Sequence, residues 1–232
     1  MVHNLGPTAM TAALLAKRPV LVQGHWQAGA ATFAALASAR EFATVERVEM
    51  AGVYDLADAA GPMASSDSGA FFEQALARHH GHWVRWTPLE HKRMIWRDDL
   101  PGFLAQPMGA LDVVGVATET SAAAVRFDLG IADSLGKIGG GRASHDMFVD
   151  LWGTDERGAP LARRTVISDP LGQCHLTAVG ALIGAERSLG LDGAAPPAPG
   201  LAFPEAVIDP VRALDRLRDY GVGVETGLPV GH

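Results

Sequence analysis

The chain has 232 residues, and its formal net charge of −7 comes without any run of lysines and arginines. This balance argues against a nucleic-acid partner, which requires a basic stripe. The single cysteine, Cys174, excludes an internal disulfide and a zinc site built from cysteines. No apolar run approaches the roughly 20 residues that span a bilayer, and no signal peptide opens the sequence, so we expect a cytoplasmic protein without membrane contact. The alanine- and glycine-rich composition with few lysines is typical of a GC-rich bacterial genome.

Two helices and two strands are predicted before residue 54. Pro7 pre-sets φ at the start of the first helix, and the run Val20-Leu21-Val22 is typical of a buried strand. A turn at residues 24–29 leads into a helix of small residues, after which apolar and charged side chains alternate as in a half-buried strand. The four elements are expected at residues 8–17, at 18–23, from the turn to about 40, and at 45–53.

The middle of the chain is rich in strand signals. A loop of glycine, proline and serine at residues 55–67 ends in good N-cap residues, and we expect a helix after it that carries Phe71, Phe72 and Leu76. Strands are then expected at residues 82–86, 91–96, 125–129, 145–152 and 161–168, with a hairpin turn at 155–158. Because these strands follow one another without intervening helices, they favour an antiparallel or mixed sheet.

The C-terminal part is predicted to be helical. Asp169-Pro170 and Asp209-Pro210 each combine a helix cap with a proline in the first turn, and Gly221 stops the second helix. The fold class expected is α+β, with helices packed on one face of a mixed or largely antiparallel sheet of five or more strands. The expected organisation is an α+β domain at residues 1–189, a Pro/Gly-rich linker at 190–204, and a C-terminal helix and tail that pack back on the domain at 205–232.

His25 and Trp26 occupy the predicted turn between a strand and a helix N-terminus. Such turns collect ligand groups, because their free N–H groups favour anions and the loop is exposed. His25 is therefore a catalytic candidate and Trp26 a substrate-binding candidate. The alternative is that His25 caps the helix beside a packed tryptophan.

Ser66, Asp67 and Ser68 place two hydroxyls and a carboxylate at another predicted helix N-terminus. This group is suited to holding the polar end of a substrate, with Asp67 as a catalytic candidate and the two serines as binding candidates. Serine and aspartate are also the residues that helix caps demand, so capping alone is the alternative.

Lys137 and Arg142 flank a run of glycines at residues 139–141. The segment is not a phosphate loop, because its lysine precedes the glycines and a strand follows them. We expect a mobile or tightly turned loop between strands. Both cations are candidates for binding an anionic substrate group.

Asp128, His145 and His175 are the remaining ionisable candidates. Arg126 and Asp128 alternate with apolar residues, so they share one face of their strand. His145 begins a strand directly after the glycine-rich loop, and a histidine near a carboxylate can do general acid–base work. Asp128 is thus a substrate-binding candidate and His145 a catalytic one, with a structural histidine at a strand end as the alternative.

Several common motifs are absent. His79, His80 and His82 do not converge on one ion and fit a solvated helix C-terminus, so no metal site is expected. The sequence has no Gly-x-Ser-x-Gly motif for nucleophilic hydrolysis and no Gly-x-Gly-x-x-Gly turn for a pyrophosphate. We therefore expect no cofactor to be bound by this chain alone.

Three stretches together resemble the saccharopine dehydrogenase-like reductases. They are Asn4-Leu5-Gly6-Pro7 with the helix and strand after it, Val45-Glu46-Arg47-Val48-Glu49 leading to Gly61-Pro62-Met63-Ala64, and Val125-Arg126-Phe127-Asp128-Leu129-Gly130 before the glycine-rich loop. In that family an N-terminal Rossmann domain binds NAD(P), and a second α+β domain covers the substrate and builds the dimer. The chain resembles the end of the first domain and most of the second. NAD(P) is thus expected only with a nucleotide-binding domain that this sequence lacks.

The resemblance implies the substrate-binding and dimerisation portion of an NAD(P)-dependent oxidoreductase, acting on a small organic substrate as a homodimer. In that role His25 and Trp26 would line the cleft beside the nicotinamide, and His145 would be the acid–base group. The segment of Ser66 to Ser68 would hold the polar end of the substrate. Two alternatives stay open: a stand-alone, cofactor-independent isomerase, cyclase or dehydratase, and a non-catalytic small-molecule-binding protein.

Overall fold

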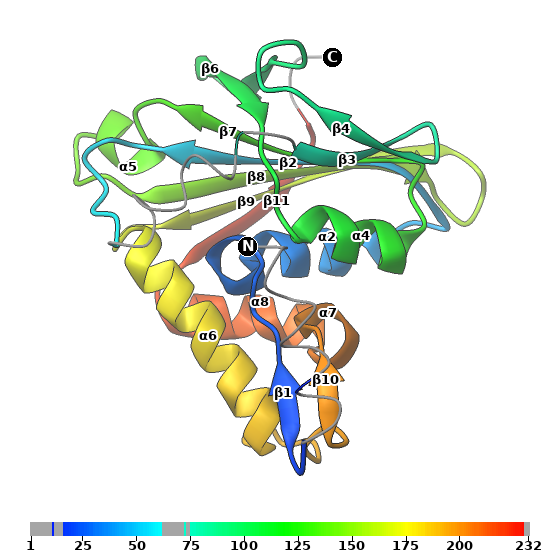
Figure 1. Ribbon diagram of the computed structural model, residues 1–232. Helices are drawn as coiled ribbons and strands as arrows, with labels where there is room; N and C mark the ends of the chain where they lie inside the picture. The colour runs from blue at the N-terminus through cyan, green and yellow to red at the C-terminus, as the bar shows by residue number, and fades with distance from the viewer. Residues whose placement is uncertain (1–10, 12–15, 62–71, 73–74, 230–232) are drawn as a thin grey trace.

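The computed structural model describes Thr11 and residues 16–61, 72 and 75–229. Its main feature is a nine-stranded sheet built from β2 (Thr44–Tyr54), β3 (Ala75–His79), β4 (His82–Trp86), β5 (Arg93–Arg97), β6 (Leu100–Pro107), β7 (Ala124–Ile131), β8 (His145–Thr154), β9 (Pro160–Asp169) and β11 (Gly223–Gly227). The order across the sheet is β11-β9-β8-β2-β7-β3-β4, while β6 pairs with β7 and with β5 (Figure 1). β2 and β7 run parallel, and the other pairings are antiparallel. The sheet is therefore mixed.

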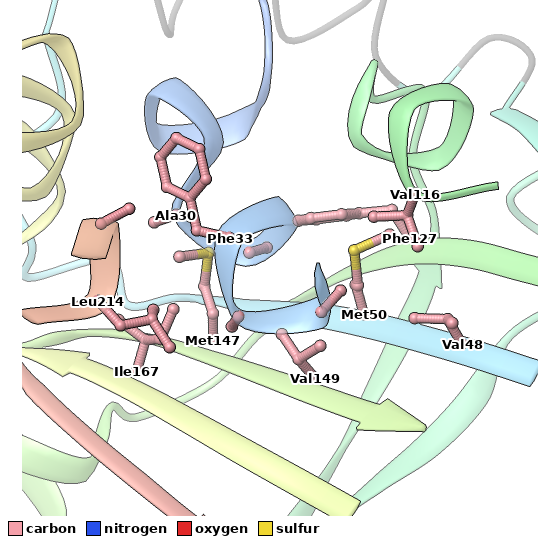
Figure 2. Close-up of a cluster of buried hydrophobic side chains, with 14 of the residues drawn as sticks. Ala30, Phe33, Val48, Met50, Val116, Phe127, Met147, Val149, Ile167 and Leu214 are labelled. Carbon is pink, nitrogen blue, oxygen red and sulfur yellow. The ribbon is translucent and has the colours of Figure 1, made fainter. Parts of the chain in front are cut away.

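Helices cover one face of this sheet. In Figure 1, α2 (Ala30–Ala39), α4 (Asp112–Thr120) and α8 (Pro210–Asp219) lie against it. Alternate residues of β2, β7 and β8 point toward the helices, and Figure 2 shows Met147 of β8 beneath Phe33 of α2, with Met50 of β2 nearer to Val116 of α4. The alanines of α2 are buried on several sides, and their small side chains let this helix lie close to the strands. The expected α+β class, with helices on one face of a mixed sheet, is confirmed.

The β5–β6 hairpin covers part of the other face. Ile95 and Phe103 of the hairpin form a second apolar cluster with Val53 and Phe148 of the sheet. A Cβ atom at Gly130 would lie 2.5 Å from the Phe103 ring, so glycine at this position allows β6 to approach β7 closely. The charged residues of this face surround the cluster and are described below.

A smaller unit lies away from the main sheet. β1 (Pro19–Leu21) pairs in parallel with β10 (Gly200–Ala202), beside α6 (Gln173–Leu189) and α7 (Pro204–Val207) (Figure 1). A Cβ atom at Gly184 would lie 2.1 Å from the Gln23 side chain, so this glycine brings α6 onto the segment after β1. The division at residues 190–204 stays a prediction. In the structure that segment contributes β10, and the residues after it contribute α8 and β11.

The helix expected to carry Phe71, Phe72 and Leu76 is helical at Phe72, but it does not extend to Leu76, and Phe71 lies outside the described residues. Residues 75–79 alternate buried and less buried positions and form β3, which is the period of a strand. The expected helix C-terminus at His79 and His80 is instead the tight turn to β4, with φ of 49° at His80 and 78° at Gly81. Positive φ at two successive residues is typical of the turn that joins hairpin strands.

Other differences concern the helices. α4, β6 and β11 have no counterpart among the expected elements. In α4, Val113, Val114 and Val116 have weak helix propensity, so the helix depends on its packing against the rest of the protein. α6 begins at Gln173 rather than directly after Asp169-Pro170. The cap at Asp209 is confirmed, since its side chain accepts the Arg212 N–H. No helix of the described residues is long and apolar enough to cross a membrane.

Candidate functional site

His145 is the centre of a buried polar cluster on the helix-covered face of the sheet. It is the first residue of β8, and its ring is fully buried. The indole nitrogen of Trp26 lies 3.3 Å from Nε2 of His145, and the side-chain nitrogen of Gln27 lies 3.2 Å from the same atom. An indole N–H only donates, so Nε2 of His145 accepts and carries no proton. The proton of the neutral ring is therefore on Nδ1.

Asp58 faces that proton. Its Oδ2 atom lies 3.4 Å from Nδ1 of His145, which is ion-pair distance without full hydrogen-bond geometry. The Gln173 N–H, at the start of α6, donates to the same carboxylate over 3.0 Å. A helix N-terminus stabilises negative charge. A Cβ atom at Gly172 would lie 2.2 Å from Oδ1 of Asp58, so glycine at that position makes room for the carboxylate.

Gln27 is oriented by α6. Its Oε1 atom accepts a hydrogen bond from the Thr177 hydroxyl, which leaves the amide nitrogen facing His145. A Cβ atom at Gly180 would lie 2.8 Å from the carbonyl oxygen of Gln27 and 2.9 Å from Cβ of Ala28. Gly180 therefore lets α6 pack directly on the turn that carries Trp26 and Gln27.

That turn, η2 (Trp26–Gly29), is strained. Gln27, Ala28 and Gly29 have φ of 49°, 54° and 101°, and a left-handed conformation costs a non-glycine residue roughly 1–2 kcal/mol. Buried Asp112 holds the turn, because its carboxylate accepts the Trp26 N–H over 2.7 Å and the Thr32 hydroxyl over 2.8 Å. Burial raises the pKa of Asp112, and these hydrogen bonds and the nearby His25 oppose that rise.

His25 points toward α7 and not toward His145. Its Nε2 atom lies 3.2 Å from Oε2 of Glu205, and both side chains are almost fully buried. Burial by itself lowers the pKa of His25, but the carboxylates of Glu205 and Asp112 raise it more, so the net shift is upward from 6.5. The structure thus brings Trp26 to His145 and directs the neighbouring His25 elsewhere.

Asp128 lies on the opposite face of the sheet. Its carboxylate is fully buried and makes ion pairs of 2.6 Å with both Arg93 and Arg126. Arg93 also contacts Glu49 over 2.7 Å. The sheet therefore separates Asp128 from His145, and its role in binding a substrate stays a prediction.

Lys137 and Arg142 are exposed at the loop before β8. The segment that was expected to be a plain loop contains the short helix α5 (Leu135–Ile138), capped by the Ser134 hydroxyl. The ammonium group of Lys137 lies 2.6 Å from Asp133, whose hydrogen bond raises the pKa of the lysine. Arg142 donates weakly to the carbonyl oxygen of Leu171 over 3.5 Å. Ser66, Asp67 and Ser68 lie outside the described residues.

Known proteins were compared with the chain in three ways. No protein-family model and no curated protein sequence matches it. Its structure is similar to apo histidine-tagged saccharopine dehydrogenase (L-Glu forming) from Saccharomyces cerevisiae, with a TM-score of 0.62. The match covers 91% of this chain and 74% of that one at 9% sequence identity, which shows the fold alone. The chain has a saccharopine dehydrogenase-like fold.

Four residues of the site were not among the candidates predicted from the sequence. They are Gln27, Asp58, Asp112 and Glu205. Gln27 adjoins Trp26, which was its only available signal. Asp58 sits in a loop without a motif, and Asp112 belongs to a helix that the sequence did not predict. Within the described ranges, no group of three or more histidine, cysteine, aspartate and glutamate side chains is placed to hold a metal ion.

Proposed function

We propose that this chain is the substrate-binding and dimerisation portion of a saccharopine dehydrogenase-like NAD(P)-dependent oxidoreductase that acts on a small organic substrate. The proposal rests on the His145–Asp58 pair. Two side-chain N–H groups from the strained turn η2, those of Trp26 and Gln27, lie at hydrogen-bond distance from Nε2 of His145. Backbone strain of this kind is concentrated at functional sites. The fold likeness supports the class of enzyme only coarsely.

In this proposal, Nε2 of His145 takes a proton from the substrate and later returns one. Asp58 stabilises the imidazolium that forms, since its carboxylate faces Nδ1. The donors of Trp26 and Gln27 turn from His145 to a substrate oxygen when the substrate enters. Ser66, Asp67 and Ser68 remain candidates for holding its polar end.

The described residues do not fit a dinucleotide. The strand-turn-helix unit of β1, η2 and α2 has the order of a pyrophosphate cradle, but the buried carboxylate of Asp112 already accepts the Trp26 N–H of that turn. A pyrophosphate there would meet a second negative charge at close range. We therefore propose that NAD(P), which would supply hydride chemistry, requires a separate nucleotide-binding domain.

A second candidate is a cofactor-independent isomerase, cyclase or dehydratase. The His145–Asp58 pair favours it, because a proton acceptor and the group that stabilises its charged form are both supplied by this chain. Proton exchange between a bound substrate and D2O without nucleotide, lost in His145→Asn, would support this candidate over the first. A non-catalytic binding protein would show binding without exchange.

The proposal is tested by calorimetric titration of the purified chain with saccharopine, and with NADPH and NADH. We expect saccharopine to bind without nucleotide, and we expect His145→Asn and Asp58→Asn each to weaken binding by about tenfold or more. His82→Asn, at an exposed position, is the matched control and should bind as the parent does. Equal binding by all variants would contradict the proposal, and no binding of saccharopine would contradict saccharopine as the substrate.

The proposed homodimer is a separate matter and follows from the resemblance. Light scattering coupled to size-exclusion chromatography would give a mass of about twice 24.3 kDa if the chain dimerises. A mass of one chain at micromolar concentration would contradict dimerisation but would leave the role of His145 untouched.

A further inference from the structure

A cavity of about 750 Å³ is lined by Glu205 and by none of the residues of the His145 cluster. It is bounded by the ends of α2 and α4, the start of β2 and the segment from Glu205 to Pro210. The His145 cluster belongs to the interior around Trp26, whereas this cavity opens beside α7. Glu205 lines it and also pairs with His25, so this residue connects the two regions.

The charges at the cavity do not cancel. Among the described residues that line it, Arg40 is the only basic one, and Asp209 pairs with it over 2.5 Å. This leaves Glu119 and Glu205 in excess. The Glu205 side chain is only 10% exposed, and no group of the described residues donates a hydrogen bond in good geometry to its Oε2 atom. His25, 3.2 Å away, neutralises Glu205 only when it is protonated.

Two helices add to the negative potential. α2 and α4 both end at the cavity: α4 has no basic residue in its last turn, and the cap of α2, Arg40, is already paired with Asp209. The C-terminal end of a helix carries a partial negative charge, which a cation stabilises. The walls between these charges are apolar, with Leu36, Phe42 and Ile208 among them. The cavity therefore combines a cation-binding end with a hydrocarbon-binding wall.

We propose that this cavity binds a small organic cation, a primary ammonium group carried on a hydrocarbon body. The ammonium group binds the carboxylate of Glu205, Glu119 adds attraction at the rim, and the hydrocarbon body lies on the wall of Phe42. The site does not include the His145–Asp58 pair, and it does not depend on the function proposed for that pair.

Binding at Glu205 is linked to the protonation of His25. Of the charged groups around Glu205, His25 faces its carboxylate directly, and Asp112 acts on His25. Glu119 and the Arg40–Asp209 pair line the same cavity. A protonated His25 competes with the ligand for the carboxylate, so affinity should rise as pH increases through the pKa of His25. By reciprocity, a bound ammonium group lowers the pKa of His25.

The test uses benzylammonium chloride, with benzyl alcohol as the neutral match, in a titration of the purified chain followed by NMR. Benzylammonium should shift the signals of residues 119–121 and 205–209 and lower the pKa of His25, and benzyl alcohol should bind at least about tenfold more weakly. Equal binding of the two compounds, or a pKa of His25 that saturating benzylammonium leaves unchanged, would overturn the proposal.

Variants locate the site. Glu205→Gln should weaken benzylammonium binding by about tenfold, and Glu156→Gln, in the exposed β8–β9 turn, should leave it unchanged. If circular dichroism shows that Glu205→Gln does not fold, Glu119→Gln at the exposed rim takes its place, with an expected loss of about threefold. Parent-like affinity in every folded variant would contradict the assignment to this cavity.

Discussion

The two faces of the central sheet both bury charged groups, but they satisfy them differently. Under the β5–β6 hairpin, buried Asp128 meets two arginines, and Asp150 receives two hydrogen bonds of 2.6 Å from Arg164. On the helix-covered face, Asp58 and Asp112 meet amide, hydroxyl and imidazole groups.

This difference separates charged groups that stabilise the fold from charged groups that can still interact with a ligand. A buried carboxylate that is paired with arginine is costly to unpair, and its oxygens are already occupied by hydrogen bonds, so it has little capacity to bind a ligand. On the helix-covered face, Nδ1 of His145 lies 3.4 Å from Asp58 without a full hydrogen bond, so this pair keeps hydrogen-bonding capacity that the arginine pairs have already used. The polar residues of the helix-covered face are therefore the better candidates for chemistry, although both sets are equally buried.

The largest expected effect comes from breaking the paired face. Asp128→Asn should lower the free energy of unfolding by about 3 kcal/mol, because it leaves Arg93 and Arg126 without their shared counter-ion. Urea unfolding measures this loss, with Asp99→Asn at an exposed position as the control. The variant should still bind saccharopine if it folds. A loss below about 0.5 kcal/mol would show that the pairs are not structural.

A smaller loss is expected where α6 meets η2. Gly180→Ala would place a methyl group against Gln27 and Ala28, which should cost about 1–3 kcal/mol and displace the donors from His145. Gly227→Ala is the matched control, because nothing lies within 4 Å of a Cβ atom there. Thermal unfolding and the indole N–H signal of Trp26 report the two effects. A variant as stable as the Gly227 control would contradict the close packing of α6.

Ala28→Gly should have the opposite sign. Ala28 has φ of 54°, so glycine relieves the left-handed strain, and part of the gain is lost to the flexibility of the unfolded chain. We expect the free energy of unfolding to rise by about 0.5–1 kcal/mol. A decrease of that size in urea unfolding would mean that the turn is not strained.

The smallest expected effect is a pH dependence that His25 causes. Its pKa is raised in the folded state, so its contribution to stability is fully present below the unfolded value near 6.5 and is lost as pH rises through the folded value. The free energy of unfolding of the parent should therefore fall with pH in that window relative to His25→Asn. Parallel pH profiles for the two proteins would contradict the His25–Glu205 pair.

The sequence predicted the strands that carry clear alternation, and it failed where local pattern and tertiary packing disagree. β7, β8 and β9 alternate apolar and polar residues and lie where they were expected. α4 did not follow from its valine-rich sequence, because its helical state depends on burial of Val113 and Val116 against the sheet.

The site was predictable only in part, for a similar reason. Trp26 and His145 were both singled out, and the structure brings them together across 119 positions of sequence. Their partners Asp58 and Gln27 carry no motif, and their contacts exist only after α6 and β8 have packed on η2. No spacing rule in the chain encodes contacts of this kind.

The state of the His145 ring tests the central claim most directly. Nitrogen-15 NMR of histidine-labelled protein distinguishes a protonated from an unprotonated ring nitrogen, and we predict an unprotonated Nε2 beside a protonated Nδ1 at neutral pH. Saccharopine should then shift both signals as Trp26 and Gln27 turn to it. A ring that carries its proton on Nε2, or signals that do not change at saturating saccharopine, would contradict the account.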